Sequence, residues 1–71
     1  MNRTPVNSSH VKSVGHDFER SILEVEFNNG AIHQYHNVPQ STYAQIVSSS
    51  SVGKTFHDTI RSKPFRSTQI K

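Results

Sequence analysis

Two short stretches of this sequence alternate apolar and polar residues, and the tripeptide Asn28-Asn29-Gly30 separates them. In the first stretch, Leu23 to Phe27, every second residue is apolar, and a period of two predicts a strand with one buried face. Asparagine and glycine are typical of tight turns, because glycine adopts the left-handed backbone conformation that such turns require. The pattern therefore predicts a β-hairpin that ends at about Val38.

Two registers are open for this hairpin, and they differ in the face towards which its rings point. A two-residue turn pairs Phe27 with Ile32 and places His33 and Tyr35 on the solvent side. A three-residue loop pairs Phe27 with Ala31 and turns both rings towards the apolar face. We favour the three-residue loop because it gathers the apolar side chains on one face. The opposite face then carries Glu24, Glu26, Gln34 and His36, with Ile22 and Ile32 partly exposed.

The segments before and after the hairpin are less regular. A further strand is expected from His10 to His16 because of its β-branched content, and a polar turn at residues 17–20 joins it to the hairpin. The first nine residues contain turn formers and one apolar anchor, Val6, which indicates an extended segment with a mobile tip. Residues 67–71 are predicted to form a frayed tail.

Two short helices are predicted after the hairpin. Pro39 suits the first helical position, because its missing N–H would have no partner there. The residues Tyr43, Ile46 and Val47 follow at spacings of three and four and form one apolar stripe. A serine at the end of the run 48–51 can cap a second helix. The second helix carries the stripe Val52, Phe56 and Ile60 and ends near Ser62, before Pro64, with Phe65 folding back onto the core.

The predicted order of elements defines an α+β fold, a three-stranded antiparallel meander followed by two short helices packed on one face. The chain has 71 residues and is expected to form one domain. A domain of this size buries only roughly 60% of the surface that its unfolded chain exposes, so the core is thin. We expect an ordered core over residues 6–65, with residues 1–5 and 67–71 mobile.

Positive charge is concentrated near the C-terminus. Eight Lys and Arg residues face five Asp and Glu residues, which leaves a net charge of +3 with histidine neutral. Such a cluster attracts nucleic acid, acidic membranes or acidic proteins, and the alternative is an exposed face that only aids solubility. The basic residues of the last eighteen positions are Lys54, Arg61, Lys63, Arg66 and Lys71.

The composition also bears on the cellular compartment. The chain has no cysteine, which excludes a disulfide framework and a thiolate zinc site and fits a reducing compartment. No apolar run approaches the roughly 20 residues of a membrane helix, and the N-terminal segment lacks the apolar middle of a signal peptide. We therefore expect a soluble cytoplasmic protein that does not enter a membrane.

Signals for catalysis or for a bound cofactor are weak. The triplet Gly53-Lys54-Thr55 resembles part of a phosphate loop, but Ser48 stands where that loop needs a glycine, and a helix precedes it. Five histidines suggest a metal, but their spacing along strands argues against a site, and no paired carboxylate supports one. The serines, His57 and Asp58 supply hydrolytic residue types without an ordering motif. We predict no enzyme activity, no metal and no cofactor.

Nucleic-acid binding requires basic side chains for phosphates and exposed planar groups for bases. Arg61, Lys63 and Arg66 surround the end of the second predicted helix, and Arg3 joins them if the N-terminal segment lies nearby. Few aromatic rings are free to contact bases, because most of them are expected to pack in the core. Tyr35 is either a core ring with its hydroxyl at the edge or a ring that contacts bases, and the sequence leaves both readings open.

Short motifs follow one another in a characteristic order from Arg3 to about Phe65. They are Arg3-x-Pro-Val-x-Ser-Ser, Val14-Gly15, Leu23-x-Val-x-Phe-x-x-Gly, x-Tyr35-x-x-Val-Pro-x-x-x-Tyr43 and Ser51-x-Gly-Lys-x-Phe-x-x-x-Ile-Arg61. Together they resemble the KTSC domain, a family named for its place at the C-terminus of some lysyl-tRNA synthetases and also found as small bacterial and phage proteins. The function of that family is not established. The resemblance implies an RNA-binding role, as expected of an appendage on a tRNA enzyme.

The chain departs from this family at its central signature, Tyr-x-Tyr. His33 stands in place of the first tyrosine, while Tyr35 keeps the second. If the paired rings stack on bases, this chain has lost one ring and gained a group that contacts phosphate when protonated. If the rings belong to the core, His33 is a mild change in packing.

The leading prediction is a non-enzymatic binding module that contacts RNA, or nucleic acid generally, through its basic C-terminal patch. The alternative is a protein-interaction module that docks a partner on the outer sheet face or along an edge strand, and a homodimer through an open edge is also open. The candidate nucleic-acid-binding residues are Arg61, Lys63, Arg66, Lys54 and Arg3, with Tyr35 and His33 as secondary candidates.

Overall fold

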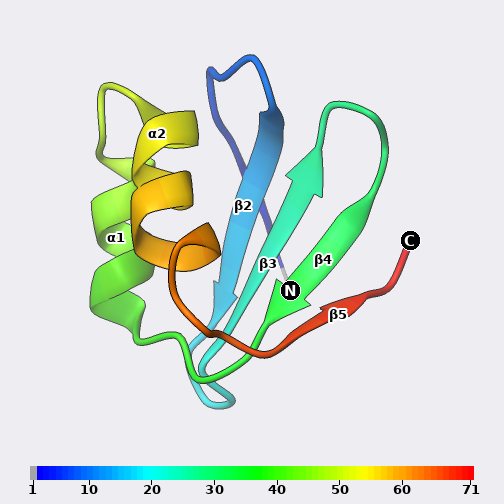
Figure 1. Cartoon of the computed structure of the whole chain (residues 1–71), viewed down its shortest axis with the longest axis vertical. Coiled ribbons are helices and arrows are strands. Elements are labelled where there is room, and N and C mark those ends of the chain that lie inside the picture. Colours follow the sequence, from blue (N-terminus) through cyan, green and yellow to red (C-terminus); the bar gives the residue numbers. More distant parts are fainter. Residues whose placement is uncertain (1) are drawn as a thin grey trace.

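An antiparallel sheet of five strands carries two short helices on one of its faces (Figure 1). The structure is a computed structural model that describes residues 2–71. The strands follow chain order across the sheet: β1 (Thr4–Pro5), β2 (Val11–Asp17), β3 (Ile22–Phe27), β4 (Ile32–Tyr35) and β5 (Ser67–Gln69). The helices are α1 (Gln40–Val47) and α2 (Val52–Phe56), and α2 continues into a π-helical turn, η1 (His57–Arg61). The predicted α+β class is confirmed.

The hairpin of β3 and β4 has the three-residue loop that the sequence favoured. Val25 pairs with His33, and the Phe27 N–H donates to the Ala31 carbonyl at 2.8 Å. Gly30 has a φ of +92°, a conformation in which a side chain would be strained. The inward orientation of His33 and Tyr35 is therefore confirmed.

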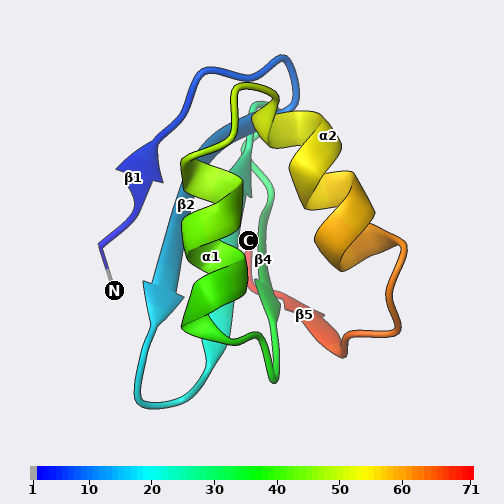
Figure 2. The same cartoon turned by 90° about the vertical axis from the view of Figure 1, so that its left-hand side faces the viewer.

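The core lies between the sheet and the helices, and both predicted helical stripes contribute to it. Ile46 of α1 and the stripe of the second helix are buried, and Figure 2 shows both helices on the same side of the sheet. Phe65 is half-buried and packs against the core, as predicted. Within residues 2–71, no helix has the length and apolarity needed to cross a bilayer. The largest fully buried side chains are Leu23, Ile46, Ile60, Val11, Val14, Val25 and Val38.

The prediction of three strands was wrong, because a short strand pairs at each edge of the meander. β1 pairs with β2, and β5 pairs with β4. The segment 67–71, predicted to be a frayed tail, thus forms a strand, and the His36 N–H also donates to the Arg66 carbonyl at 2.8 Å. All three residues of β5 are exposed. The strand is held by its backbone, so its sequence shows no apolar alternation.

The new edge strand also changes the environment of Ile32. This residue was expected to be partly exposed, but only 7% of its surface is accessible. The Ile32 carbonyl accepts the Ile70 N–H at 2.8 Å, and the Ile32 N–H donates to the Lys71 carbonyl at 3.2 Å. The chain that follows β5 therefore lies directly against Ile32. Ile22, farther from this edge, is half-buried as expected.

Candidate functional site

An open groove of about 830 Å³ lies between the sheet and the second helix, at the end of the sheet where β3 turns into β4. The start of β2, the β3–β4 hairpin and the helical segment α2–η1 form its walls, and these segments meet at one end of the molecule (Figure 1). We call it the hairpin groove. The lining residues used below are His10, Phe27, Asn28, Asn29, His33, Tyr35, Lys54, Phe56, His57 and Arg61.

The floor of the hairpin groove is a cluster of aromatic rings. The Phe56 ring meets the rings of Phe27 and Tyr35 edge to face, at centroid distances of 5.8 and 5.6 Å. The His33 ring contacts Phe27 edge to face at 5.3 Å and lies nearly parallel to Tyr35 at 6.3 Å. Aromatic pairs favour such arrangements, so the rings hold one another in place. His33, in β4, is half-buried, and its ring lines the groove.

The rim of the hairpin groove carries basic and titratable nitrogen groups. Lys54 of α2, Arg61 of η1, His10 and His57 are all exposed. Within residues 2–71, no Asp or Glu side chain lines the groove. The nearby acid Asp58 forms an ion pair with Lys54 at 3.7 Å, and both side chains are more than half exposed. Such a surface pair is weak and leaves Lys54 able to bind an anion.

Tyr35 links the floor to the rim. Burial raises the pKa of the Tyr35 hydroxyl above its ordinary value, and the nearby Arg61 guanidinium opposes that shift. The hydroxyl therefore stays neutral at physiological pH. Only 8% of Tyr35 is exposed, so the ring belongs to the core and does not offer a free face for stacking.

The structure brings together four of the predicted site residues and separates the other three. Lys54, Arg61, Tyr35 and His33 line the hairpin groove. Lys63 and Arg66 are exposed on the segment between η1 and β5, outside the groove's lining. Positive charge thus continues from Arg61 along the chain that leaves the groove.

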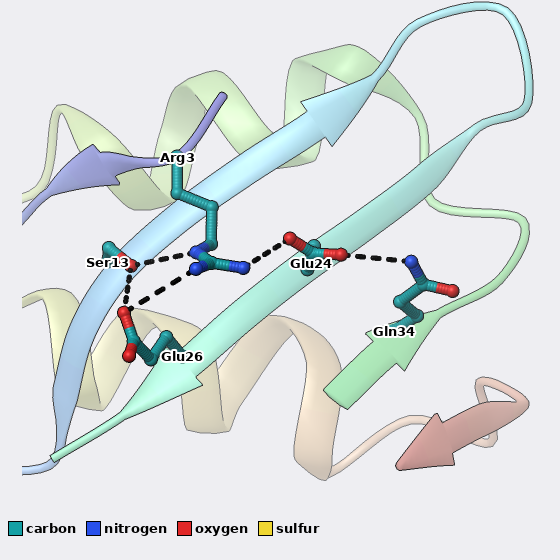
Figure 3. Close-up of polar contacts among 5 residues, drawn as sticks. All are labelled: Arg3, Ser13, Glu24, Glu26 and Gln34. Atoms are coloured by element: carbon teal, nitrogen blue, oxygen red, sulfur yellow. Dashed lines mark hydrogen bonds and ion pairs between the residues drawn. The ribbon is translucent and has the colours of Figure 1, made fainter. Parts of the chain in front are cut away.

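Arg3 is the third separated residue, and its predicted place in the basic patch was wrong. It lies on the opposite face of the sheet, where its guanidinium forms an ion pair with Glu24 (Figure 3). Its Nε donates to the Ser13 hydroxyl at 3.2 Å, and its Nη2 lies 3.7 Å from a carboxylate oxygen of Glu26. Glutamates of β3 therefore neutralise Arg3, which leaves it a structural role.

Six of the lining residues named above were not predicted as site residues from the sequence: His10, Phe27, Asn28, Asn29, Phe56 and His57. Phe27 was assigned to the core alone, and His10 and His57 were considered only for metal binding or hydrolysis. The signal for His10 and Phe27 lay in the pairing of strands, since the start of β2 lies beside the end of β3, where Val11 pairs with Phe27. In the described part of the chain, no three His, Asp or Glu side chains are placed to hold a metal ion.

Comparison with known proteins places this fold in a defined class. A protein of unknown function from Stutzerimonas stutzeri (strain A1501) is 34% identical over 70 residues, which cover 99% of each chain. A protein from Tsukamurella paurometabola is 27% identical over 66 residues, which cover 93% of this chain and 97% of that one. The crystal structure of a KTSC domain protein from Yersinia pestis superposes with a TM-score of 0.86 and 32% identity, covering 99% of this chain and 97% of that one.

The fold and the groove define a small two-layer α+β domain with a basic groove, floored by aromatic rings, at one end of its sheet. The family model of the KTSC domain matches residues 7–65. The chain therefore belongs to the KTSC domain family, as its motifs indicated.

Proposed function

We propose that this protein is a non-enzymatic module that binds RNA or another single-stranded nucleic acid in the hairpin groove. The lining of the groove carries the proposal, because Lys54, Arg61 and three histidines surround aromatic rings with no carboxylate among the described lining residues. Basic side chains attract phosphates, and apolar rings accept the flat faces or edges of bases. The proposal assigns no catalytic step to the groove.

The size of the hairpin groove supports a single strand over a duplex. A volume of about 830 Å³ lies within the range that holds a ligand of drug size. A short single-stranded segment can place a base against Phe27 or His33 while its phosphates meet Lys54 and Arg61. A duplex keeps its bases stacked inside and would engage only the basic rim, so we expect weaker binding.

The polar rim of the groove favours phosphate contacts over the reading of a base sequence. The Asn28 side-chain amide donates to the Ser8 carbonyl at 3.2 Å, and the Asn29 side-chain oxygen accepts the Ala31 N–H at 3.0 Å. One end of each amide is thus engaged by the chain's own backbone, which limits how the two side chains can turn towards a base. The groups left for a ligand are mostly cations, and we expect little preference among bases.

Lys63 and Arg66 have a secondary part in this proposal. Both are exposed, and in residues 2–71 neither side chain forms an ion pair. They extend the positive charge from Arg61 towards β5 and can meet phosphates that leave the groove at this end.

Fluorescence anisotropy with a labelled single-stranded RNA of roughly ten nucleotides tests the proposal. The titration is made at about 50 mM and about 200 mM salt, because phosphate contacts make affinity fall steeply as salt rises. The variant Arg61→Ala should weaken binding and flatten the salt dependence. The matched control is Arg20→Ala, which removes the same charge from the β2–β3 turn at the other end of the sheet (Figure 1).

Two outcomes would overturn the proposed function. One is the absence of binding at the lower salt concentration for both single strands and duplex. The other is an equal loss of affinity in Arg61→Ala and Arg20→Ala, because binding would then depend on net charge and not on the groove. Retained affinity in the control with reduced affinity in Arg61→Ala supports the proposal.

A protein-interaction module is the second candidate, and β5 is the observation that favours it. β5 is an exposed edge strand, and half of the Ile70 side chain next to it is accessible. An edge strand of this kind can pair with a strand of another chain. Light scattering over a range of protein concentrations tests self-association, and Ile70→Lys should abolish any dimer that forms along this edge.

A further inference from the structure

We propose that the three histidines of the hairpin groove make its binding of nucleic acid depend on protonation, so that affinity rises as the pH falls through the range in which histidine titrates. The inference rests on the proposed function, because it names the condition that regulates the same site. Three histidines from three separate segments carry it: His10 just before β2, His33 in β4 and His57 at the start of η1.

The rings of these three histidines are not engaged by the protein's own polar groups. Over residues 2–71, no hydrogen bond or ion pair to the side chain of His10, His33 or His57 is found. The other two histidines differ in this respect. The His16 ring nitrogen Nε2 lies 2.7 Å from the Val38 carbonyl, and that of His36 lies 3.2 Å from the Thr68 hydroxyl. The unengaged histidines are therefore the ones that line the groove.

The charges around the groove leave these rings without an internal counterion when they are protonated. The cations Lys54 of α2 and Arg61 of η1 face the groove, and Tyr35 of β4 is neutral. Phe27 of β3 also lines the groove, and Gln69 of β5 pairs with His33. Neither of these two residues carries a charge. The nearby acid on the helical segment is Asp58, paired with Lys54.

A bound phosphate backbone supplies the missing counterions. Protonation of the three rings adds up to three positive charges to a groove that already holds Lys54 and Arg61. Because no carboxylate of the described residues lines the groove and the nearby Asp58 is paired with Lys54, these charges are balanced mainly by salt or by an anionic ligand. Proton binding and nucleic-acid binding therefore favour one another, as thermodynamic linkage requires.

The sign and size of the effect follow from ordinary histidine chemistry. Histidine as a residue type changes charge near pH 6.5, so measurements at about pH 5.5 and about pH 8 bracket the range in which it titrates. Affinity is expected to rise roughly tenfold between these two values, if each charged ring adds a partly exposed ion pair. Lys54 and Arg61 supply the positive charge that the groove carries throughout this pH range.

The test measures the affinity of the full chain for a labelled oligouridylate at about pH 5.5 and about pH 8, at constant ionic strength. Uracil has no base nitrogen that gains a proton in this range, so the probe keeps its charge. The triple variant His10→Gln, His33→Gln, His57→Gln should lose the gain, so that its affinity is the same at the two pH values, whatever the loss of the His33 ring costs at both. Because His33 packs against core rings, the double variant His10→Gln, His57→Gln is measured as well, and its gain should fall by more than half.

The control variant is His36→Gln, which removes a histidine outside the groove and should keep the full gain. Circular dichroism at both pH values confirms that each variant is folded. Equal affinity of the wild type at both pH values overturns the proton dependence but leaves the proposed function standing. A gain that survives in the double and triple variants overturns its assignment to these histidines. The absence of binding at both pH values contradicts the proposed function itself.

Discussion

Arg3 and Glu24 form an ion pair across the outer face of the sheet, on the side opposite the hairpin groove (Figure 3). Only 7% of Glu24 is exposed, and its second carboxylate oxygen accepts the Gln34 side-chain amide at 2.9 Å. Both oxygens of this buried carboxylate therefore have partners, which a buried charge requires. One partner comes from the N-terminal segment and the other from β4. The pair ties β1 to the middle of the sheet.

The first prediction concerns the loss of this pair. Arg3→Ala leaves the Glu24 carboxylate buried without its counterion and should lower the free energy of unfolding by roughly 1–3 kcal/mol. Urea denaturation measures this loss. The double variant Arg3→Ala, Glu24→Gln removes the stranded charge and should recover part of it. Arg3→Ala should leave nucleic-acid affinity unchanged under conditions in which the variant is folded, and a loss as large as that of Arg61→Ala would contradict the structural role.

The second prediction concerns Gly15, which lets the N-terminal segment approach β2. A methyl group at this position would lie 2.6 Å from the Asn2 carbonyl oxygen and 3.0 Å from a side-chain carbon of Arg3. Because backbone must shift to relieve this contact, Gly15→Ala should lower the free energy of unfolding by roughly 1–3 kcal/mol. The matched control is Gly53→Ala, whose methyl group meets only the Ser8 hydroxyl at 3.0 Å. If the control is destabilised as much as Gly15→Ala, the close approach at β1 is not the cause.

Local patterns in the sequence predicted those elements whose own residues determine their backbone conformation or their buried face. The hairpin register followed from the alternation of apolar residues, because only the three-residue loop places the apolar side chains of both strands on one face. The stripe of Val52, Phe56 and Ile60 predicted a helix face that is indeed buried. β5 gave no such signal, because it pairs through its backbone with a strand far earlier in the chain: His33 pairs with Gln69, 36 residues later.

The candidate site was less predictable than the fold, because it depends on which segments meet in space. In the sequence, Arg3 and Arg61 are equivalent basic residues near two ends of the chain. The sheet places them on opposite faces, and only the glutamates of β3 make Arg3 structural. His10 joined the groove because the start of β2 lies beside the end of β3. No local pattern carries that information.

The third prediction ranks the basic residues of the C-terminal third. Arg61 lines the hairpin groove, whereas Lys63 lies outside its lining on the following segment. Arg61→Ala should lower the affinity for single-stranded RNA about two- to fivefold and reduce the salt slope by roughly one. Lys63→Ala removes the same charge and should have a smaller effect on both quantities. Equal effects of the two variants would mean that the groove is not the centre of the interface.

The last prediction uses the ionisation of Tyr35 to test the contact between the floor and the rim of the groove. Burial raises the pKa of Tyr35 above its ordinary value, and Arg61 opposes this shift. A group whose pKa is raised by folding contributes stability that is full below its unfolded pKa, about 10 for tyrosine, and is lost as the pH rises through the folded pKa. The protein should therefore lose stability above about pH 10, and Tyr35→Phe should lessen this alkaline loss.

The titration of Tyr35 can be isolated because the chain has only one other tyrosine, Tyr43. Tyr43 is half-buried, and its hydroxyl has a weak contact of 3.4 Å with the Thr4 hydroxyl, so Tyr43→Phe should fold normally. In this variant, tyrosinate absorbance reports Tyr35 alone and should show a pKa above the ordinary value. Adding Arg61→Ala removes the opposing cation and should raise that pKa further, whereas adding Arg20→Ala should not. An unchanged pKa after loss of Arg61 would show that its guanidinium does not lie near the Tyr35 hydroxyl in solution, and would remove Arg61 from the rim of the groove.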